Sequence, residues 1–167
     1  MVFYRTTYSS PLGTITIISE GTKIMNLCFD DQKHYPFKLV AKTTPNDSLA
    51  IFKETKCWLD AYFKGLKKKI HPPLRLIGTN FQEKVWRALL EIPYGTVITY
   101  QMVAIRIRNP KAFRAVGQAI SRNPISIIIP CHRVIGSKQN LTGFAAGIER
   151  KVALLRREGL DLNRFSI

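Results

Sequence analysis

Cysteine and acidic residues are scarce in this chain of 167 residues. Its three cysteines, Cys28, Cys57 and Cys131, form no Cys-x-x-Cys pair. Their odd number argues against a disulfide framework and favours a reducing, cytoplasmic compartment. Neither His34 nor His71 stands at metal-ligand spacing from a cysteine, so we expect no metal site.

Several longer features are also missing. No apolar run approaches the length of a membrane span, and the N-terminus lacks the basic, apolar and small-residue series of a secretory signal. Neither a Gly-x-Gly-x-x-Gly loop nor a phosphate-binding P-loop occurs, so no nucleotide cofactor is expected. The sequence predicts a soluble, intracellular protein that works without a membrane or a cofactor.

Positive charge dominates what is present. Lys and Arg number 26 against 11 Asp and Glu, which gives a net charge of +15 and an isoelectric point near 10.1. Residues 1–80 hold 12 basic and 6 acidic residues, and residues 81–167 hold 14 and 5, so the excess is spread along the chain. Such charge favours a polyanion as partner, although a lysine-rich soluble surface has the same composition.

Residue patterning divides the chain into two predicted domains, 1–78 and 79–167. The first begins with three β-rich segments separated by turn residues, which predict a small antiparallel meander over 3–7, 14–18 and 24–29. We expect a loop over 30–47. A helix should then begin at a cap among 46–48 and end at Lys64 or Gly65.

A β-branched apolar run at 127–129 ends at Pro130 and is followed by Cys131 and His132. We expect a short buried strand, because β-branched residues suit a pleated apolar environment and proline ends the ladder. The bend after proline lets the thiol and the imidazole face one cleft. A thiol becomes a strong nucleophile when a base or a positive field removes its proton. The pair is therefore a candidate reactive centre, and a core cysteine beside a chance histidine is the alternative.

Helix signals surround this centre in the predicted second domain. Asn80 and Glu83 have the spacing of a capping box, and Thr99 is the expected cap of a short helix over 100–106 with Met102 in the core. A final helix over 148–158 should end at a glycine. Glu158 falls in its last turn, where the helix dipole disfavours a carboxylate, so we expect a compensating partner.

A further helix begins at Asn109 and Pro110 and has two unlike faces. Its predicted buried face consists of Phe113, Val116, Gly117 and Ile120. The opposite face is basic and otherwise small, and it consists of Lys111, Arg114, Ala115, Gln118, Ser121 and Arg122. Together with the helix over 100–106, this pattern predicts a helix-turn-helix whose second helix reads DNA.

Three motifs together resemble the O6-alkylguanine-DNA alkyltransferases, also called methylated-DNA–protein-cysteine methyltransferases. They are Ile-Pro-Cys-His-Arg-Val-Ile at 129–135, Asn-Pro-Lys-Ala-Phe-Arg-Ala-Val-Gly at 109–117 and Thr-Gly-Phe-Ala-Ala-Gly at 142–147. The match is nearly continuous from 81 to 159. It implies an α/β N-terminal domain of ribonuclease-H-like layout, with a small antiparallel sheet and helices. It also implies a mainly α C-terminal domain that contains a winged or helix-turn-helix DNA-binding motif.

The resemblance implies a DNA-repair reaction that needs no cofactor. Cys131 would take the alkyl group of O6-methylguanine irreversibly, in a single turnover. By the same resemblance Glu158 orients His132, which removes the thiol proton through water, and Asn123 orders the turn that precedes the cysteine. The residues implied to bind the substrate are Tyr100, Arg114, Val134, Phe144 and Ala145.

The implied partner is double-stranded DNA, bound through its minor groove by a monomer. Arg114 would take the vacated place in the base stack, and Tyr100 would help to rotate the damaged nucleotide out, which costs a few kcal/mol. Two residues depart from the family pattern. Ala145 stands where some members have serine and Ala146 where glycine is frequent, which leaves the range of accepted alkyl groups open.

Two other functions remain possible at this point. A DNA-binding protein without enzymatic activity would explain the charge and the helices, but it would leave Cys131, His132 and Glu158 without a role. A cysteine hydrolase would explain Cys131 and His132, but neither Arg114 nor the high isoelectric point.

Overall fold

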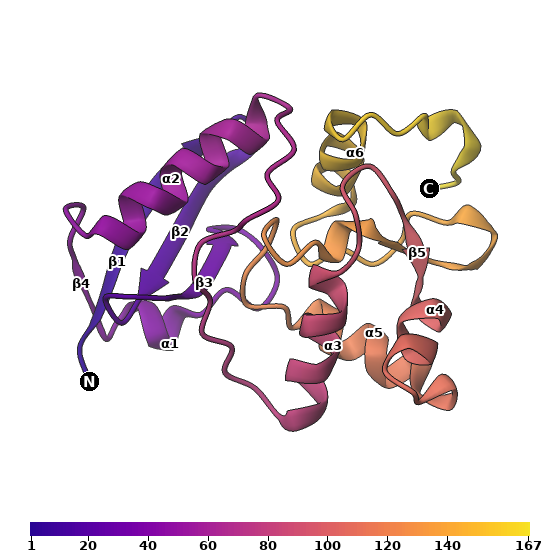
Figure 1. Cartoon of the computed structure of the whole chain (residues 1–167), viewed down its shortest axis with the longest axis horizontal. Coiled ribbons are helices and arrows are strands. Elements are labelled where there is room, and N and C mark those ends of the chain that lie inside the picture. The colour runs from indigo at the N-terminus through magenta and orange to yellow at the C-terminus, as the bar shows by residue number, and fades with distance from the viewer. The chain divides into compact units, whose positions relative to one another are not determined.

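The computed structural model describes residues 1–167 and divides them into two compact units, Met1–Leu76 and Ile77–Ile167 (Figure 1). The first unit combines a sheet with helices, and the second is mainly helical. This arrangement confirms the predicted two-part fold at the level of its architecture. No helix in either unit is both long and apolar enough to cross a bilayer.

The first unit is built on a four-stranded sheet in the order β3-β2-β1-β4. The predicted antiparallel meander is confirmed, and it consists of β1 (Phe3–Ser10), β2 (Gly13–Ser19) and β3 (Ile24–Phe29). β4 (Thr43–Pro45) pairs in parallel with β1, so the sheet is mixed and not wholly antiparallel. The predicted loop over 30–47 was wrong, since it holds β4 and α1 (Phe37–Val40). Elements of three or four residues are too short to show a periodic pattern.

α2 (Ala50–Phe63) packs on one face of this sheet (Figure 1). The hydroxyl of Tyr8 in β1 donates to Asp60 of the helix at 2.7 Å. Ile15 lies directly opposite Tyr8 and shares its face, so the buried side chains of β2 meet the helix there. The predicted side-chain cap among 46–48 was wrong, because Leu49 occupies the cap position and makes no capping bond.

The second unit packs its helices around a two-stranded parallel sheet, in which β5 (Ile98–Thr99) pairs with β6 (Val134–Ile135). Its helices are α3 (Asn80–Leu90), α4 (Tyr100–Arg106), α5 (Phe113–Ser121) and α6 (Ile148–Arg157). Four 3₁₀ turns complete the unit: η1 (Pro110–Ala112), η2 (Cys131–Arg133), η3 (Ser137–Gln139) and η4 (Leu162–Arg164).

The buried face of α5 differs from the predicted one. Val116 and Ile120 are buried as expected, together with Ala119, whose carbonyl accepts a 2.8 Å hydrogen bond from the Trp86 indole of α3. Phe113 was predicted to be buried but is 43% exposed. Phe113 is the first residue of the helix. The periodic pattern assumes that each turn packs against the core, and at a helix end part of that packing is missing. Met102 of α4, expected in the core, is similarly 45% exposed.

The capping box of α3 lies one residue earlier than predicted. Thr79 accepts a hydrogen bond from the Gln82 N–H at 3.2 Å, and the Gln82 side chain accepts one from the Thr79 N–H at 3.0 Å. Asn80 and Glu83, the predicted pair, have the same spacing, so spacing alone does not choose between them. Thr99 caps α4 as predicted, accepting from the Met102 N–H at 3.2 Å.

We expect Thr79→Ala to lower the free energy of unfolding by about 1 kcal/mol, because it removes the hydroxyl acceptor of the capping box. Thr79→Ser keeps that acceptor and serves as the matched control. Urea denaturation followed by circular dichroism measures both variants. Equal midpoints for the alanine and serine variants would contradict the assigned cap.

Candidate active site

The segment predicted as a strand over 127–129 is a tight turn instead. Ile127 has a φ of 71°, a left-handed conformation that β-branched residues rarely adopt. The Ile129 N–H donates to the Ile125 carbonyl at 3.0 Å, and the Cys131 N–H donates to the Ile129 carbonyl at 2.7 Å. The isoleucines are buried all the same. An apolar run indicates that its residues are buried. It does not distinguish a buried turn from a buried strand, because both contain consecutive apolar residues.

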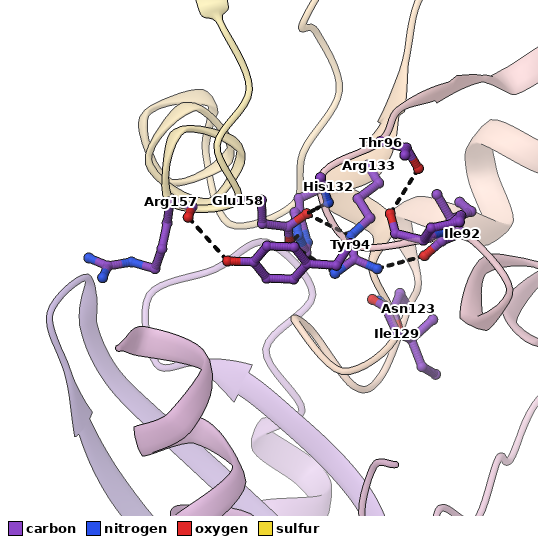
Figure 2. A network of polar contacts seen from close by, with 11 residues as sticks. Ile92, Tyr94, Thr96, Asn123, Ile129, His132, Arg133, Arg157 and Glu158 are labelled. Atoms are coloured by element: carbon purple, nitrogen blue, oxygen red, sulfur yellow. Dashed lines mark hydrogen bonds and ion pairs between the residues drawn. The ribbon is translucent and has the colours of Figure 1, made fainter. Parts of the chain in front are cut away.

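Asn123 connects this turn to α5. Its side-chain amide donates to the Ile129 carbonyl at 2.9 Å (Figure 2). Its side-chain oxygen accepts from the Ile125 N–H at 3.0 Å. Both bonds are buried, where a lost partner costs most. The turn thereby delivers Cys131 to η2, with 4% of its surface exposed.

The surroundings of the Cys131 thiol act on its pKa in both directions. Burial raises the pKa of Cys131 above its usual value. The Asn123 amide, the Lys151 ammonium and the backbone N–H groups of Cys131 and His132 act in the opposite direction. The resting thiol therefore keeps its proton at neutral pH, while the groups that would stabilise a thiolate already surround it.

Glu158, at the C-terminal cap of α6, is the centre of a buried polar network (Figure 2). Its Oε1 lies 2.6 Å from Nε2 of His132. Arg133 donates to both carboxylate oxygens, from Nε at 2.8 Å and from Nη2 at 3.0 Å, and the Gly95 N–H donates to Oε2 at 3.0 Å. These donors compensate for the unfavourable dipole at the helix end, as the sequence led us to expect.

The turn before β5 is attached to the same network. Arg133 also donates to the Ile92 carbonyl at 2.6 Å, and its guanidinium lies 5.6 Å from the ring centre of Tyr94. Gly95 has a φ of 75°, and a Cβ there would lie 3.0 Å from the Glu158 carbonyl oxygen. Glycine is therefore the residue that lets this turn aim its N–H at the carboxylate.

The network sets the protonation states of the His132–Glu158 pair. Burial alone would raise the pKa of Glu158, but the hydrogen bonds and charges of His132 and Arg133 lower it to about 2. Burial lowers the pKa of His132 and outweighs the attraction of Glu158. At neutral pH the carboxylate is ionised and the imidazole is neutral. Because the carboxylate can only accept, Nε2 carries the proton, and Nδ1 is left as a base.

Tyr100 begins α4 and reaches the loop over 142–147. Its hydroxyl donates to the Gly143 carbonyl at 3.1 Å and lies 3.4 Å from the Thr142 carbonyl. Burial and the nearby Cys131 raise the pKa of Tyr100 to about 12, so the hydroxyl remains a donor at neutral pH. Gly143 has a φ of 81°, and a Cβ there would lie 2.7 Å from that hydroxyl, so a larger residue would displace Tyr100.

The other predicted pocket residues flank the same turn. Phe144 presents its ring edge-on to His132, with the ring centres 6.5 Å apart. Val134 is buried in β6, directly after η2, and Ala145 is half-buried beside Phe144 in the loop. Ala146 is buried.

Lys151 is a site residue that the sequence interpretation missed. It is fully buried in α6, and its ammonium donates to the Val134 carbonyl at 2.5 Å and to the Thr142 carbonyl at 3.2 Å. It therefore links β6 to the loop that Tyr100 contacts. Burial lowers the pKa of Lys151 to about 8, against the opposing influence of Cys131, so the side chain is still mostly protonated at pH 7.

The predicted DNA-contacting residues lie on the surface of α5 and the turn before it. The Arg114 guanidinium lies 5.8 Å from the ring centre of its neighbour Phe113. Ser121 is half-buried and donates to the Gln118 carbonyl at 2.8 Å. The exposed members are Lys111, Arg114, Ala115, Gln118 and Arg122. This face carries cations and no carboxylate.

The site therefore holds a buried thiol, a neutral imidazole, an ionised carboxylate and a phenol donor. This is the composition of a nucleophilic centre with its own base and orienting group. No three histidine, cysteine or acidic side chains anywhere in the chain lie close enough together to hold a metal ion.

We expect the free energy of unfolding to fall as the pH drops. The folded-state pKa of Glu158, about 2, lies below the usual 4.5, so its contribution is complete above about pH 4.5 and is lost toward pH 2. The lowered pKa of His132 adds a loss that begins near pH 6.5. Urea denaturation at a series of pH values between 7 and 3 measures the slope.

Glu158→Gln should remove most of this slope below pH 4.5. It should also cost about 3–5 kcal/mol at pH 7, because Arg133 would remain buried without its counter-charge. Glu149→Gln, at an exposed position of the same helix, is the matched control and should change neither quantity. A wild-type slope in Glu158→Gln would contradict the assignment.

Two family models match the chain in succession. The ribonuclease-like domain of 6-O-methylguanine DNA methyltransferase matches residues 3–76, and the DNA binding domain of 6-O-methylguanine DNA methyltransferase matches residues 80–160. The interval between the two matches contains the Leu76–Ile77 division of the structure.

Similarity to individual proteins extends over almost the whole chain. The methylated-DNA–protein-cysteine methyltransferase of Haemophilus influenzae is 44% identical over 156 residues, which cover 93% of this chain and 86% of the relative. The protein of the same name from Methanosarcina acetivorans is 44% identical over 158 residues, which cover 93% and 98%.

A solved structure, Mycobacterium tuberculosis OGT in complex with DNA, matches with a TM-score of 0.87 and 42% identity over 97% of this chain and 94% of that one. The M. tuberculosis O6-methylguanine methyltransferase matches with a TM-score of 0.85 and 41% identity over 99% and 100%. From the order of the two domain models and the extent of these matches, the chain belongs to the 6-O-methylguanine DNA methyltransferase family.

Proposed function

We propose that this protein repairs O6-alkylguanine in double-stranded DNA by transferring the alkyl group to its own Cys131, once per molecule. The observation that carries this proposal is the buried series of thiol, neutral imidazole and ionised carboxylate formed by Cys131, His132 and Glu158. Family membership supports it, since the relatives are named for transfer from methylated DNA to a protein cysteine.

The reaction is a nucleophilic substitution at the alkyl carbon. Nδ1 of His132 takes the thiol proton through a water molecule, and Glu158 stabilises the imidazolium that forms. The sulfur attacks the alkyl carbon, an S–C bond forms, and the C–O bond breaks with its electron pair going to O6 of guanine. The base takes up one proton and leaves as normal guanine. The thioether on Cys131 is stable, so the site is consumed.

Three further groups lower the barrier by stabilising the charges that develop during the reaction. Lys151 and the Asn123 amide favour the thiolate over the thiol, which counteracts the burial of Cys131. Tyr100 keeps its proton at neutral pH and donates toward the guanine as negative charge develops on it. Hydrogen bonds to backbone carbonyls already hold these three side chains in place before substrate arrives.

We assign DNA binding to α4, η1 and α5, which together form a helix-turn-helix that enters the minor groove. The basic and small outer face of α5 supports close approach to the phosphate backbone. Arg114 fills the place left in the base stack, and Tyr100 helps to turn the nucleotide out.

For the first unit we propose a ribonuclease-H-like layout, which the strand order β3-β2-β1-β4 and the parallel β1–β4 pair support. We expect a monomer that acts in the cytoplasm.

Mass spectrometry after mixing the protein with duplex DNA containing O6-methylguanine tests the transfer. We expect one added methyl group per chain, confined to the peptide with Cys131 and absent from Cys131→Ala. Cys28→Ala is the matched control and should be methylated like the wild type, because Cys28 is buried in β3 with a pKa near 12. Tight binding to the lesion without a mass increase would leave a lesion-recognition protein and overturn the transfer.

Lys151→Met should slow alkyl transfer at pH 7 by about 10- to 100-fold, since a charge near the thiolate is worth a few kcal/mol at most. In the wild type the rate should carry a component that declines above about pH 8 as Lys151 loses its proton, and this component should be absent from the variant. Single-turnover rates between pH 6 and 9.5 measure both effects. Lys138→Met, at an exposed position, is the control. A wild-type profile in Lys151→Met would contradict the electrostatic role.

A further inference from the structure

Phe113 is a large apolar side chain on the helix assigned to DNA. It is the first residue of α5, and 43% of its surface is exposed, while the core side of the helix is formed by Val116, Ala119 and Ile120. Only part of this side chain packs against the protein, and the rest faces solvent. Packing within the protein therefore does not by itself explain why a phenylalanine stands at this position of α5.

Phe113 lies beside the residues that we assign to base flipping. The guanidinium of Arg114 lies 5.8 Å from the centre of its ring, within the range of a cation–π contact. Gly117 lies one helical turn further along the same side of α5, and a Cβ there would lie 3.8 Å from the ring of Tyr100. Phe113 thus shares its flank of the helix with the Tyr100 contact and touches the residue assigned to the base stack.

The chemistry of this flank suits a nucleic acid with a gap in its stack. Proteins that open the minor groove often insert apolar side chains between base steps, and aromatic rings stack on bases without regard to sequence. A repair protein must act in any sequence, so a contact of that kind is useful to it. The cations of the same helix, among them Lys111 and Arg114, supply the attraction to phosphate.

We propose that Phe113 is a second wedge beside Arg114, and that its ring packs against the nucleotides next to the space that the extruded guanine leaves. In the free protein the same ring holds the Arg114 guanidinium over the start of α5. This inference rests on the proposed function and adds a DNA-contacting residue to it.

Phe113→Ala separates this role from the chemistry when three substrates are compared. With duplex DNA containing O6-methylguanine, the second-order rate of transfer should fall by about 5- to 50-fold, the range that loss of one aromatic–base contact produces. With free O6-benzylguanine, which does not involve α5, the rate should stay within about twofold, as estimated from the absence of that stacking contact. A single-stranded oligonucleotide, in which no base pair has to be opened, should show an intermediate loss.

Matched variants exclude other causes. Phe37→Ala removes an exposed phenylalanine, 72% of whose surface faces solvent, from α1 of the first unit and should react like the wild type with every substrate. If Phe113 contacts DNA itself, Phe113→Ala should still slow the duplex reaction in an Arg114→Ala background. If it merely positions Arg114, the effect of Phe113→Ala should vanish there, which would overturn the direct contact.

The outcomes also separate the two proposals. Equal duplex rates for Phe113→Ala and wild type would overturn the wedge and leave the repair function intact. An equal loss with free O6-benzylguanine would assign Phe113 a structural role and also overturn the wedge. Failure of the wild type to become alkylated by any of the three substrates would instead overturn the proposed function.

Discussion

The buried carboxylate of Glu158 is the interaction on which the second unit depends. An ionised carboxylate away from water is costly unless donors surround it, and here Arg133, His132 and the Gly95 N–H provide them. These donors come from two segments, the turn before β5 and the η2 turn, and the carboxylate joins both of them to the end of α6. The same carboxylate also fixes which nitrogen of the neutral imidazole beside Cys131 carries the proton. Stability and reactivity of this unit are therefore properties of one network.

α6 contributes a second buried charge, and the two have opposite signs. Lys151 lies seven residues, or about two turns, before Glu158, so both project from one side of the helix. Glu158 is surrounded by donors, whereas the ammonium of Lys151 contacts two backbone carbonyls and influences Cys131. The helix thus supplies a negative charge to the base and a positive charge to the nucleophile. Separating the two prevents them from neutralising each other, and each keeps its effect on the group it faces.

The helix that we assign to DNA binding, α5, follows a different design, in which exposure of its side chains is the useful property. Small and basic side chains cover the outer face of α5, while Tyr100 and the loop over 142–147 connect that helix to the thiol. Gly143 leaves room for the Tyr100 hydroxyl, and Gly117 lies beside the Tyr100 ring. Phe113 is large and apolar, unlike these small and basic residues. Its contact with Arg114 connects it to the surface that we assign to DNA binding.

Much of this protein was determined by short-range features of its sequence. The β-rich segments between turn residues predicted β1, β2 and β3, Thr99 predicted the start of α4, and Gly159 predicted the end of α6, because strand and turn propensity, capping and positive φ act between near neighbours. The resemblance of the 129–135 motif indicated Cys131 as the candidate nucleophile, and the position of Glu158 at a helix end indicated that it needed a partner.

Other features were decided only by the tertiary structure. The run at 127–129 became a turn because the side chain of Asn123 bonds across it, and Phe113 at the start of α5 stayed 43% exposed. Lys151 lies three residues after Ile148 and four before Leu155, so helical spacing placed it on the inward face, but its charge favoured the surface. The carbonyls of β6 and the 142–147 loop, brought together by folding, made its burial possible. Sequence patterns record which side of an element is apolar, whereas the partners that satisfy a buried polar group come from segments far away in the chain.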